Sequence, residues 1–213
     1  MNLKKATLLA IIALCYDFAL KTYGTFFPYA FRDLTVTQIT NTITVLASLG
    51  ILLFFLYFYK EYVKTEQIGL KNATLLNIIG SGLMSLLFLK GLIKLLNPHF
   101  FNFLTTPHFI EPAIPWVSSI LILIFFVVFN QETIRKEQVS LRYATLSGVV
   151  GSSVGVVLRT FILAFYIFSS GIRWFFDLPR KMHLVFIIFL PVTIVSFALI
   201  LYFFLVFYKE QKE

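Results

Sequence analysis

Charged side chains are scarce in this sequence. Asp, Glu, Lys and Arg make up 13% of its 213 residues, whereas soluble domains contain about 25%. Hydrophobic residues account for 59%, and 26 residues are phenylalanine. So few charges cannot cover a water-soluble surface, so lipid is expected to cover much of the outside. The length fits a single domain spanning residues 1–213.

Cysteine is almost absent as well. The single Cys15 excludes an intrachain disulfide and a cysteine-based metal cluster. It follows a basic start and an apolar run, as in a lipoprotein signal, but Leu14 stands where such a signal requires a small residue. We therefore predict that the first apolar run stays in the protein as a membrane helix.

The motifs of common catalytic sites are missing too. The sequence contains no Gly-Lys-Ser/Thr phosphate loop and no His-Glu-x-x-His pair. His99, His108 and Glu111 share one loop and are weak candidates for metal ligands, because their spacing matches no usual ligand pattern. We predict that the protein is not an enzyme and holds no cofactor or metal.

What the sequence has in abundance is long apolar runs. A membrane-spanning helix needs about 20 mostly apolar residues, and the runs are apolar at both odd and even positions, which favours helices over a barrel. We predict an all-α integral membrane protein. Its six transmembrane helices are Ala6–Pro28, Ile39–Tyr59, Ala73–Leu96, Ala113–Phe129, Ala144–Phe168 and Leu184–Tyr208.

Basic residues lie at the ends of these runs. The net charge of +8 is therefore not gathered on one polar face, which argues against nucleic acid as a partner. If the loops between the predicted helices are numbered in chain order, the two termini and the second and fourth loops hold ten Lys and Arg. The first, third and fifth loops hold four. Positive residues favour the cytoplasmic side, so we predict a multi-pass protein of the cell membrane with both termini in the cytoplasm.

The sequence also repeats itself. Residues 66–75 match residues 137–146, and a shorter third copy lies at residues 3–8. The second, fourth and sixth runs end alike, at residues 54–61, 125–132 and 203–210. Similarity at a regular period indicates structural repeats. We predict three parallel helical hairpins in a pseudo-threefold arrangement, with repeats at residues 1–65, 66–136 and 137–213.

Small residues are concentrated in the odd-numbered helices. Gly80 and Gly82 occur in the third helix, and Gly148, Gly151 and Gly155 in the fifth. Small residues let helix backbones approach closely in lipid. We therefore expect the odd helices to pack centrally and the even helices to face lipid. The alternative is that the pattern serves packing alone, without a pore or cavity.

Each predicted repeat places a cation in the outer third of the membrane. These cations are Lys21, Lys90 and Arg159, and Lys94 follows Lys90 by one turn. Intramembrane ionisable residues are candidates for function, although long basic side chains near helix ends also reach the headgroups and bind nothing specific.

Asp17 is the one acid within a predicted span. It lies four residues before Lys21, and this spacing places both on one face of the helix. Tyr16 and Tyr23 could supply hydroxyl groups nearby. We therefore take Asp17, Lys21, Lys90, Arg159, Tyr16 and Tyr23 as candidate ligand-binding or ion-binding residues.

Two classes of function remain open from the sequence. The first is a small transporter or channel for an anion or an anionic amphiphile, which the embedded cations would attract. The second is a non-catalytic membrane module, namely an accessory subunit, a scaffold or a lipid-binding sensor. Membrane lipids are expected partners in either case, and other membrane protein subunits in the second.

Overall fold

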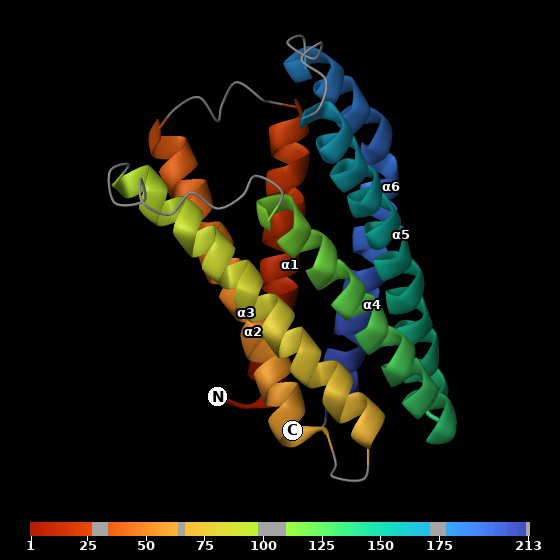
Figure 1. Cartoon of the computed structure of the whole chain (residues 1–213). Helices are drawn as coiled ribbons and strands as arrows, with labels where there is room; N and C mark the ends of the chain where they lie inside the picture. The colour runs from red at the N-terminus through yellow and green to blue at the C-terminus, as the bar shows by residue number, and fades with distance from the viewer. Residues whose placement is uncertain (27–33, 64–66, 98–109, 171–177, 212–213) are drawn as a thin grey trace.

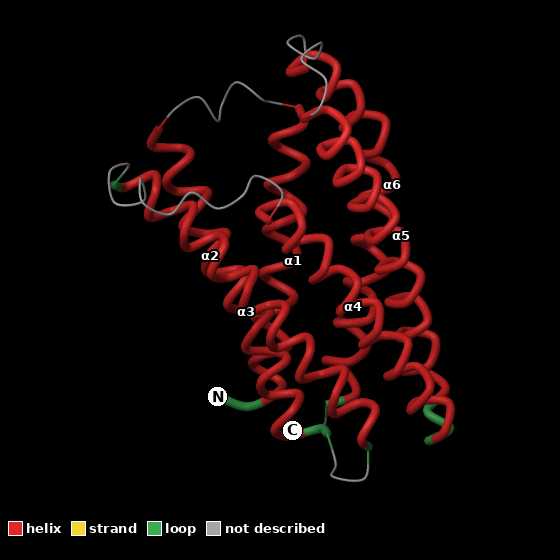
Figure 2. Tube along the Cα trace, viewed as in Figure 1, coloured by secondary structure: helices red, strands yellow, loops and turns green. Residues whose placement is uncertain are grey.

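The chain folds into long helices arranged side by side, as the computed structural model in Figure 1 shows. The structure describes residues 1–26, 34–63, 67–97, 110–170 and 178–211. Within these ranges, the side chains of residues 21, 24, 25, 110–112, 165–170 and 178–189 lie outside the description. Helices account for nearly all of the described chain, and none of it forms a strand (Figure 2).

Six helices follow one another along the chain. They are α1 (Leu3–Phe26), α2 (Leu34–Glu61), α3 (Ile68–Leu96), α4 (Ile110–Arg135), α5 (Val139–Ser170) and α6 (Leu178–Glu210). They extend beyond most of the predicted apolar runs. For example, α2 begins five residues before Ile39, and α4 ends six residues after Phe129. Backbone hydrogen bonding continues through the polar ends of a helix, whereas hydropathy marks only the apolar part.

Five of these helices, α2 to α6, are long and apolar enough to cross a membrane. The protein is therefore a helical polytopic membrane protein. The 24-residue helix α1 is not among the five, and it carries Lys4, Lys5, Asp17 and Lys21. Its crossing of the membrane stays a prediction.

The helices form a closed ring in chain order. Each helix packs against the next, and α6 packs against α1. The two termini lie at the same end of the bundle (Figure 1). We call this end the terminal end and the other the distal end. Toward the distal end, α2 and α3 tilt away from α5 and α6 (Figure 1).

Small residues hold the paired helices close together. The Ser118 hydroxyl of α4 donates a hydrogen bond of 3.1 Å to the Gly80 carbonyl of α3, and the Ser196 hydroxyl of α6 donates one of 2.6 Å to the Gly151 carbonyl of α5. Between α1 and α2, a Cβ added at Gly50 would lie 3.2 Å from a backbone oxygen of α1. Backbone contacts this close require small residues.

The core lies at the terminal end and consists mainly of phenylalanine. Nine phenylalanines, three on each even helix, are at most 4% exposed. They are Phe54, Phe55, Phe58, Phe125, Phe126, Phe129, Phe203, Phe204 and Phe207. We call them the aromatic cluster.

The position of this cluster corrects the expectation that odd helices are central and even helices face lipid. Odd and even helices alternate in the ring, and at the terminal end the even helices fill the interior. The physical reason is reach. Glycines such as Gly80 and Gly151 serve the contact with the neighbouring helix, whereas a phenylalanine ring is long enough to extend to the centre.

Candidate functional site

The distal half of the bundle is packed less tightly than the terminal half. In each helix there is a last buried residue on the way to the distal end, beyond which no described residue is buried. These residues are Ala13 in α1, Val45 in α2, Ser85 in α3, Ser118 in α4, Ser152 in α5 and Ser196 in α6. The candidate residues for ligand binding therefore lie in a half of the protein where the described side chains remain at least partly accessible.

Two of these candidates interact with each other. The Asp17 carboxylate on α1 acts electrostatically on the Arg159 guanidinium on α5, although α6 stands between their helices in the ring. Arg159 also donates a hydrogen bond through Nη1 to the Pro115 carbonyl of α4. The Arg159 side chain thus lies against α4 and within the electrostatic reach of Asp17 on α1.

The tyrosine candidates take different positions. The Tyr16 hydroxyl donates a 3.3 Å hydrogen bond to the Thr40 carbonyl of α2, so Tyr16 links α1 to α2 one residue before Asp17. Tyr23 lies two turns nearer the distal end and is 46% exposed. Tyr16 is thus held within the bundle beside the Asp17 charge, whereas the Tyr23 side chain is exposed.

The lysine candidates differ in exposure. Lys90 on α3 is half-buried, whereas Lys94, one turn later, is exposed. The backbone of Lys21 belongs to α1, but its side chain lies outside the description. The arrangement of Lys21, Lys90 and Arg159 as a ring of cations stays a prediction.

The weak metal candidates are not assembled by the described part of the chain. His99 and His108 lie outside the described residues, and Glu111 belongs to the first turn of α4 without a described side chain. Among the residues described, no three His, Cys, Asp or Glu side chains converge.

The aromatic cluster is a feature whose role sequence reasoning missed. Its ring contacts run from each even helix to the next. Phe55 of α2 meets Phe125 of α4 with ring centroids 5.1 Å apart. Phe126 of α4 meets Phe203 of α6 at 4.8 Å, and Phe204 of α6 meets Phe54 of α2 at 4.8 Å. All three pairs are edge-to-face, the geometry that aromatic rings favour.

A second layer lies nearer the terminal end. Phe58, Phe129 and Phe207 contact one another at centroid distances of 5.3, 5.6 and 6.0 Å. The repeated Phe-Phe helix ends were visible in the sequence. They served there only as a mark of repetition, because hydropathy cannot distinguish a ring in lipid from a ring in the core.

Tyr62 covers this second layer. Its ring lies 4.8 Å from that of Phe58, 5.4 Å from Phe129 and 5.6 Å from Phe207, so it touches all three even helices. The Lys136 ammonium lies 5.3 Å from the centroid of the same ring. Burial, together with the charges of Glu132 and Glu210, raises the pKa of Tyr62 to about 12. The phenol therefore stays neutral over the physiological range.

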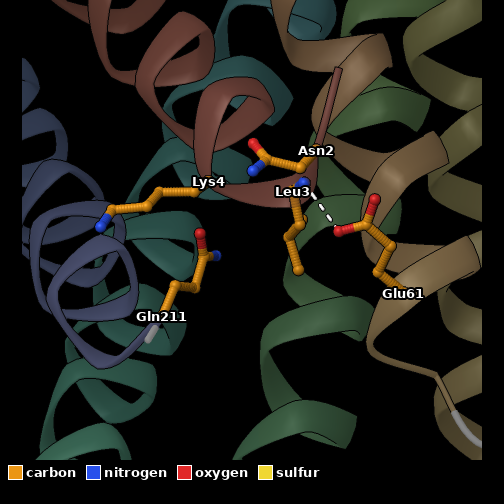
Figure 3. A pocket seen from close by; sticks show the side chains of 5 residues that line it. All are labelled: Asn2, Leu3, Lys4, Glu61 and Gln211. Carbon is orange, nitrogen blue, oxygen red and sulfur yellow. Dashed lines mark hydrogen bonds between the residues drawn. The ribbon is translucent and has the colours of Figure 1, made fainter. Parts of the chain in front are cut away.

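A small pocket of about 200 Å³ lies at the terminal end, where α1 begins and α2 and α6 end. Asn2, Leu3, Lys4, Glu61 and Gln211 line it (Figure 3). The groups of this pocket that could best bind an anion are the backbone N–H groups at the start of α1, and they already have acceptors within the protein. The Glu61 carboxylate accepts the Leu3 backbone N–H at 2.8 Å, and the Asn2 side chain accepts the Lys5 N–H at 3.0 Å. The start of α1 is capped from within the protein.

Comparison with known proteins adds no relative. No protein-family model matches the chain, and neither a curated protein nor a solved structure matches it. Function has to be argued from the geometry alone.

Proposed function

We propose that this protein is a small transporter for an anion or an anionic amphiphile, with Lys21, Lys90 and Arg159 as its membrane-embedded cations. The observation that supports this most directly is the interaction of Arg159 on α5 with Asp17 on α1. Ionisable side chains that face the interior of a membrane bundle commonly belong to a transport or binding path. We also propose that the protein is not an enzyme, so the proposal includes no chemical step.

The chemistry of such a site follows from its surroundings. A cation held in a medium of low dielectric constant attracts an anion more strongly than it would in water. Asp17 partly neutralises Arg159 when the site is empty, which lowers the cost of holding the guanidinium within the membrane. An arriving phosphate or carboxylate group competes with Asp17 for the same guanidinium. Binding is thereby favourable yet reversible, as transport requires.

The architecture we propose for this transporter is three two-helix repeats, residues 1–65, 66–136 and 137–213, around a pseudo-threefold axis. Supporting this are the ring contacts that pass from α2 to α4, from α4 to α6 and from α6 to α2. The matching serine-to-glycine hydrogen bonds in the second and third hairpins add to the support. We also propose that the terminal end faces the cytoplasm, because most basic loop residues lie there.

A flux measurement tests the function. The triple variant Lys21→Gln, Lys90→Gln, Arg159→Gln is reconstituted into liposomes beside the unaltered protein, and the uptake of chloride and of a fluorescent anionic lipid is followed. We expect a loss of at least about tenfold, since one lost charge interaction of 1.4 kcal/mol already corresponds to tenfold. The matched control is Lys94→Gln, which removes an exposed cation one turn from Lys90 and is expected to retain flux. Equal flux in all three proteins would remove the proposal.

A second candidate function is a non-catalytic lipid-binding module or accessory subunit. It is favoured by the aromatic cluster, which fills the interior of the terminal end and leaves ligand access from the distal half. This function requires binding of anionic lipid without flux. It also predicts co-purification with another membrane protein after gentle detergent extraction, whereas measurable flux by the lone chain contradicts it.

A further inference from the structure

We propose that the aromatic cluster and Tyr62 form a gate that closes the transport path at the terminal end, so that the structure is open only toward the distal end. This inference rests on the proposed transport function. It assigns a role to ten side chains that carry no charge at neutral pH and bind no ligand.

The closure is made by side chains rather than by backbones. Among the described residues, the main helix contacts follow the ring, in which each helix packs against the next and α6 packs against α1. Contact among α2, α4 and α6 across the centre is made by phenylalanine rings. A closure of this kind can open without unfolding a helix, because rotating or separating a few rings clears the centre. Constrictions lined by apolar side chains are known to gate by excluding water.

The closure also has depth. Its inner layer consists of six rings that are at most 4% exposed, namely Phe54, Phe55, Phe125, Phe126, Phe203 and Phe204. Its outer layer consists of Phe58, Phe129 and Phe207, at most 1% exposed. One helical turn separates these layers, about 5.4 Å along the axis. Tyr62 adds a third level beyond them. A hydrated anion would have to shed its water to pass three apolar levels, which is strongly unfavourable.

The residues on the distal side of the gate have a different character. Ser48 on α2 and Ser119 on α4 lie seven residues before Phe55 and Phe126, which places them on the same faces of their helices, two turns toward the distal end. Both are small and polar, and both are 7% exposed. On these two helix faces, small hydroxyl-bearing residues thus precede the rings at which the proposed gate begins.

Cysteine labelling tests the gate. In a Cys15→Ser background, Ser119→Cys places a single thiol just distal to the cluster, and a membrane-impermeant thiol reagent is added to one side of sealed vesicles at a time. Gln138→Cys at the terminal end and Leu96→Cys at the distal end are exposed controls that report the sidedness of each preparation. In the otherwise unaltered protein we expect Ser119→Cys to be labelled from the distal side, and at least tenfold more slowly from the terminal side.

Loosening the gate should remove this asymmetry. Adding Phe129→Ala takes away a ring that contacts α2, α6 and Tyr62. Adding Tyr62→Ala removes only the half-buried cap, and is the milder variant should Phe129→Ala fail to fold. Labelling from the terminal side is expected to rise in both, more in Phe129→Ala. Equal labelling from both sides before any loosening would overturn the gate, and so would folded loosened variants that stay unlabelled from the terminal side.

The outcome also separates the gate from the transport function. If Ser119→Cys is labelled from neither side in any variant, no water path reaches the cluster, and the gate is overturned. The flux of the protein with and without its embedded cations then decides independently whether transport occurs. If flux depends on those cations while labelling is symmetric, the transport function stands and the gate alone is overturned.

Discussion

The six helices pack in different ways at the two ends of this bundle. At the terminal end, nine phenylalanine rings meet across the centre and are almost completely buried. Beyond the last buried residue of each helix toward the distal end, the described side chains are at least partly accessible, and interactions between non-adjacent helices include the charges of Asp17 and Arg159. Dispersion contacts between buried rings do not depend on whether a ligand is bound. A charged side chain inside a membrane, by contrast, can exchange one oppositely charged partner for another. The difference teaches that the buried core and the candidate binding residues lie in separate halves of the same helices.

The largest expected effect breaks the terminal half. Phe129→Ala should lower the free energy of unfolding by about 3–5 kcal/mol, because the surrounding rings cannot collapse into the space left behind. Phe26→Ala is the matched control at the distal end of α1, where the ring is 62% exposed, and it should cost less than about 0.5 kcal/mol. Unfolding by denaturing detergent measures both. Similar losses in the two variants would contradict the division into two halves.

Two glycine substitutions on α5, with a smaller expected effect on stability, locate the boundary between the two halves. A Cβ added at Gly151 would lie 2.7 Å from the Ser196 carbonyl oxygen, whereas one added at Gly155, a turn away, would meet only the Ser196 hydroxyl at 3.8 Å. Gly151→Ala should therefore destabilise by about 1–3 kcal/mol through overpacking. Gly155→Ala should be neutral or stabilise by up to about 1 kcal/mol through helix propensity. Thermal unfolding in detergent compares the pair, and a larger loss at Gly155 would place the boundary elsewhere.

A third test uses the cap on the aromatic cluster. The pKa of Tyr62 is about 12 in the folded protein and 10.0 for an ordinary tyrosine. The folded state therefore holds the phenol proton more tightly, so the stabilisation is fully present below pH 10 and is lost as the pH rises through 12. Unfolding measured from pH 9 to 12 should show this loss in the unaltered protein and less of it in Tyr62→Phe. An identical pH dependence would mean that the Tyr62 ring is not buried.

The smallest expected effect concerns the turn between α4 and α5 at the terminal end. Glu137 has a positive φ of 55° and ends α4 with hydrogen bonds from its own N–H to Ile134 and from the Gln138 N–H to Thr133. Relief of this left-handed strain by Glu137→Gly is worth about 1–2 kcal/mol. The freedom of glycine in the unfolded chain offsets about 0.4–1 kcal/mol, so a gain of about 0.5–1 kcal/mol should remain. Glu137→Ala keeps the strain, and an equal gain there would point to charge as the cause.

Much of this fold could be predicted from the sequence because lipid imposes a simple rule. Apolar runs of sufficient length must be helices, and all six predicted runs lie on observed helices, except that residues 27 and 28 of the first run lie outside the described residues. Which face of a helix turns inward is a different matter. Lipid and a membrane-protein core are equally apolar, so Phe58 and Phe129 carry no signal that separates the two environments. The charges were more informative, because an acid such as Asp17 is costly to place against lipid and so marks a candidate site from the sequence alone.

The order in which the ring closes has a consequence for synthesis. The Gln211 side chain donates a hydrogen bond to the Thr7 hydroxyl, joining positions 204 residues apart. At about 5–20 residues per second, the first helix waits roughly 10–40 s for the last one. During that time Asp17 stands in a half-built bundle, and its electrostatic partner Arg159 arrives only with the fifth helix. Insertion machinery that shelters early helices until late ones emerge should therefore matter more for this chain than for a bundle built from self-sufficient pairs.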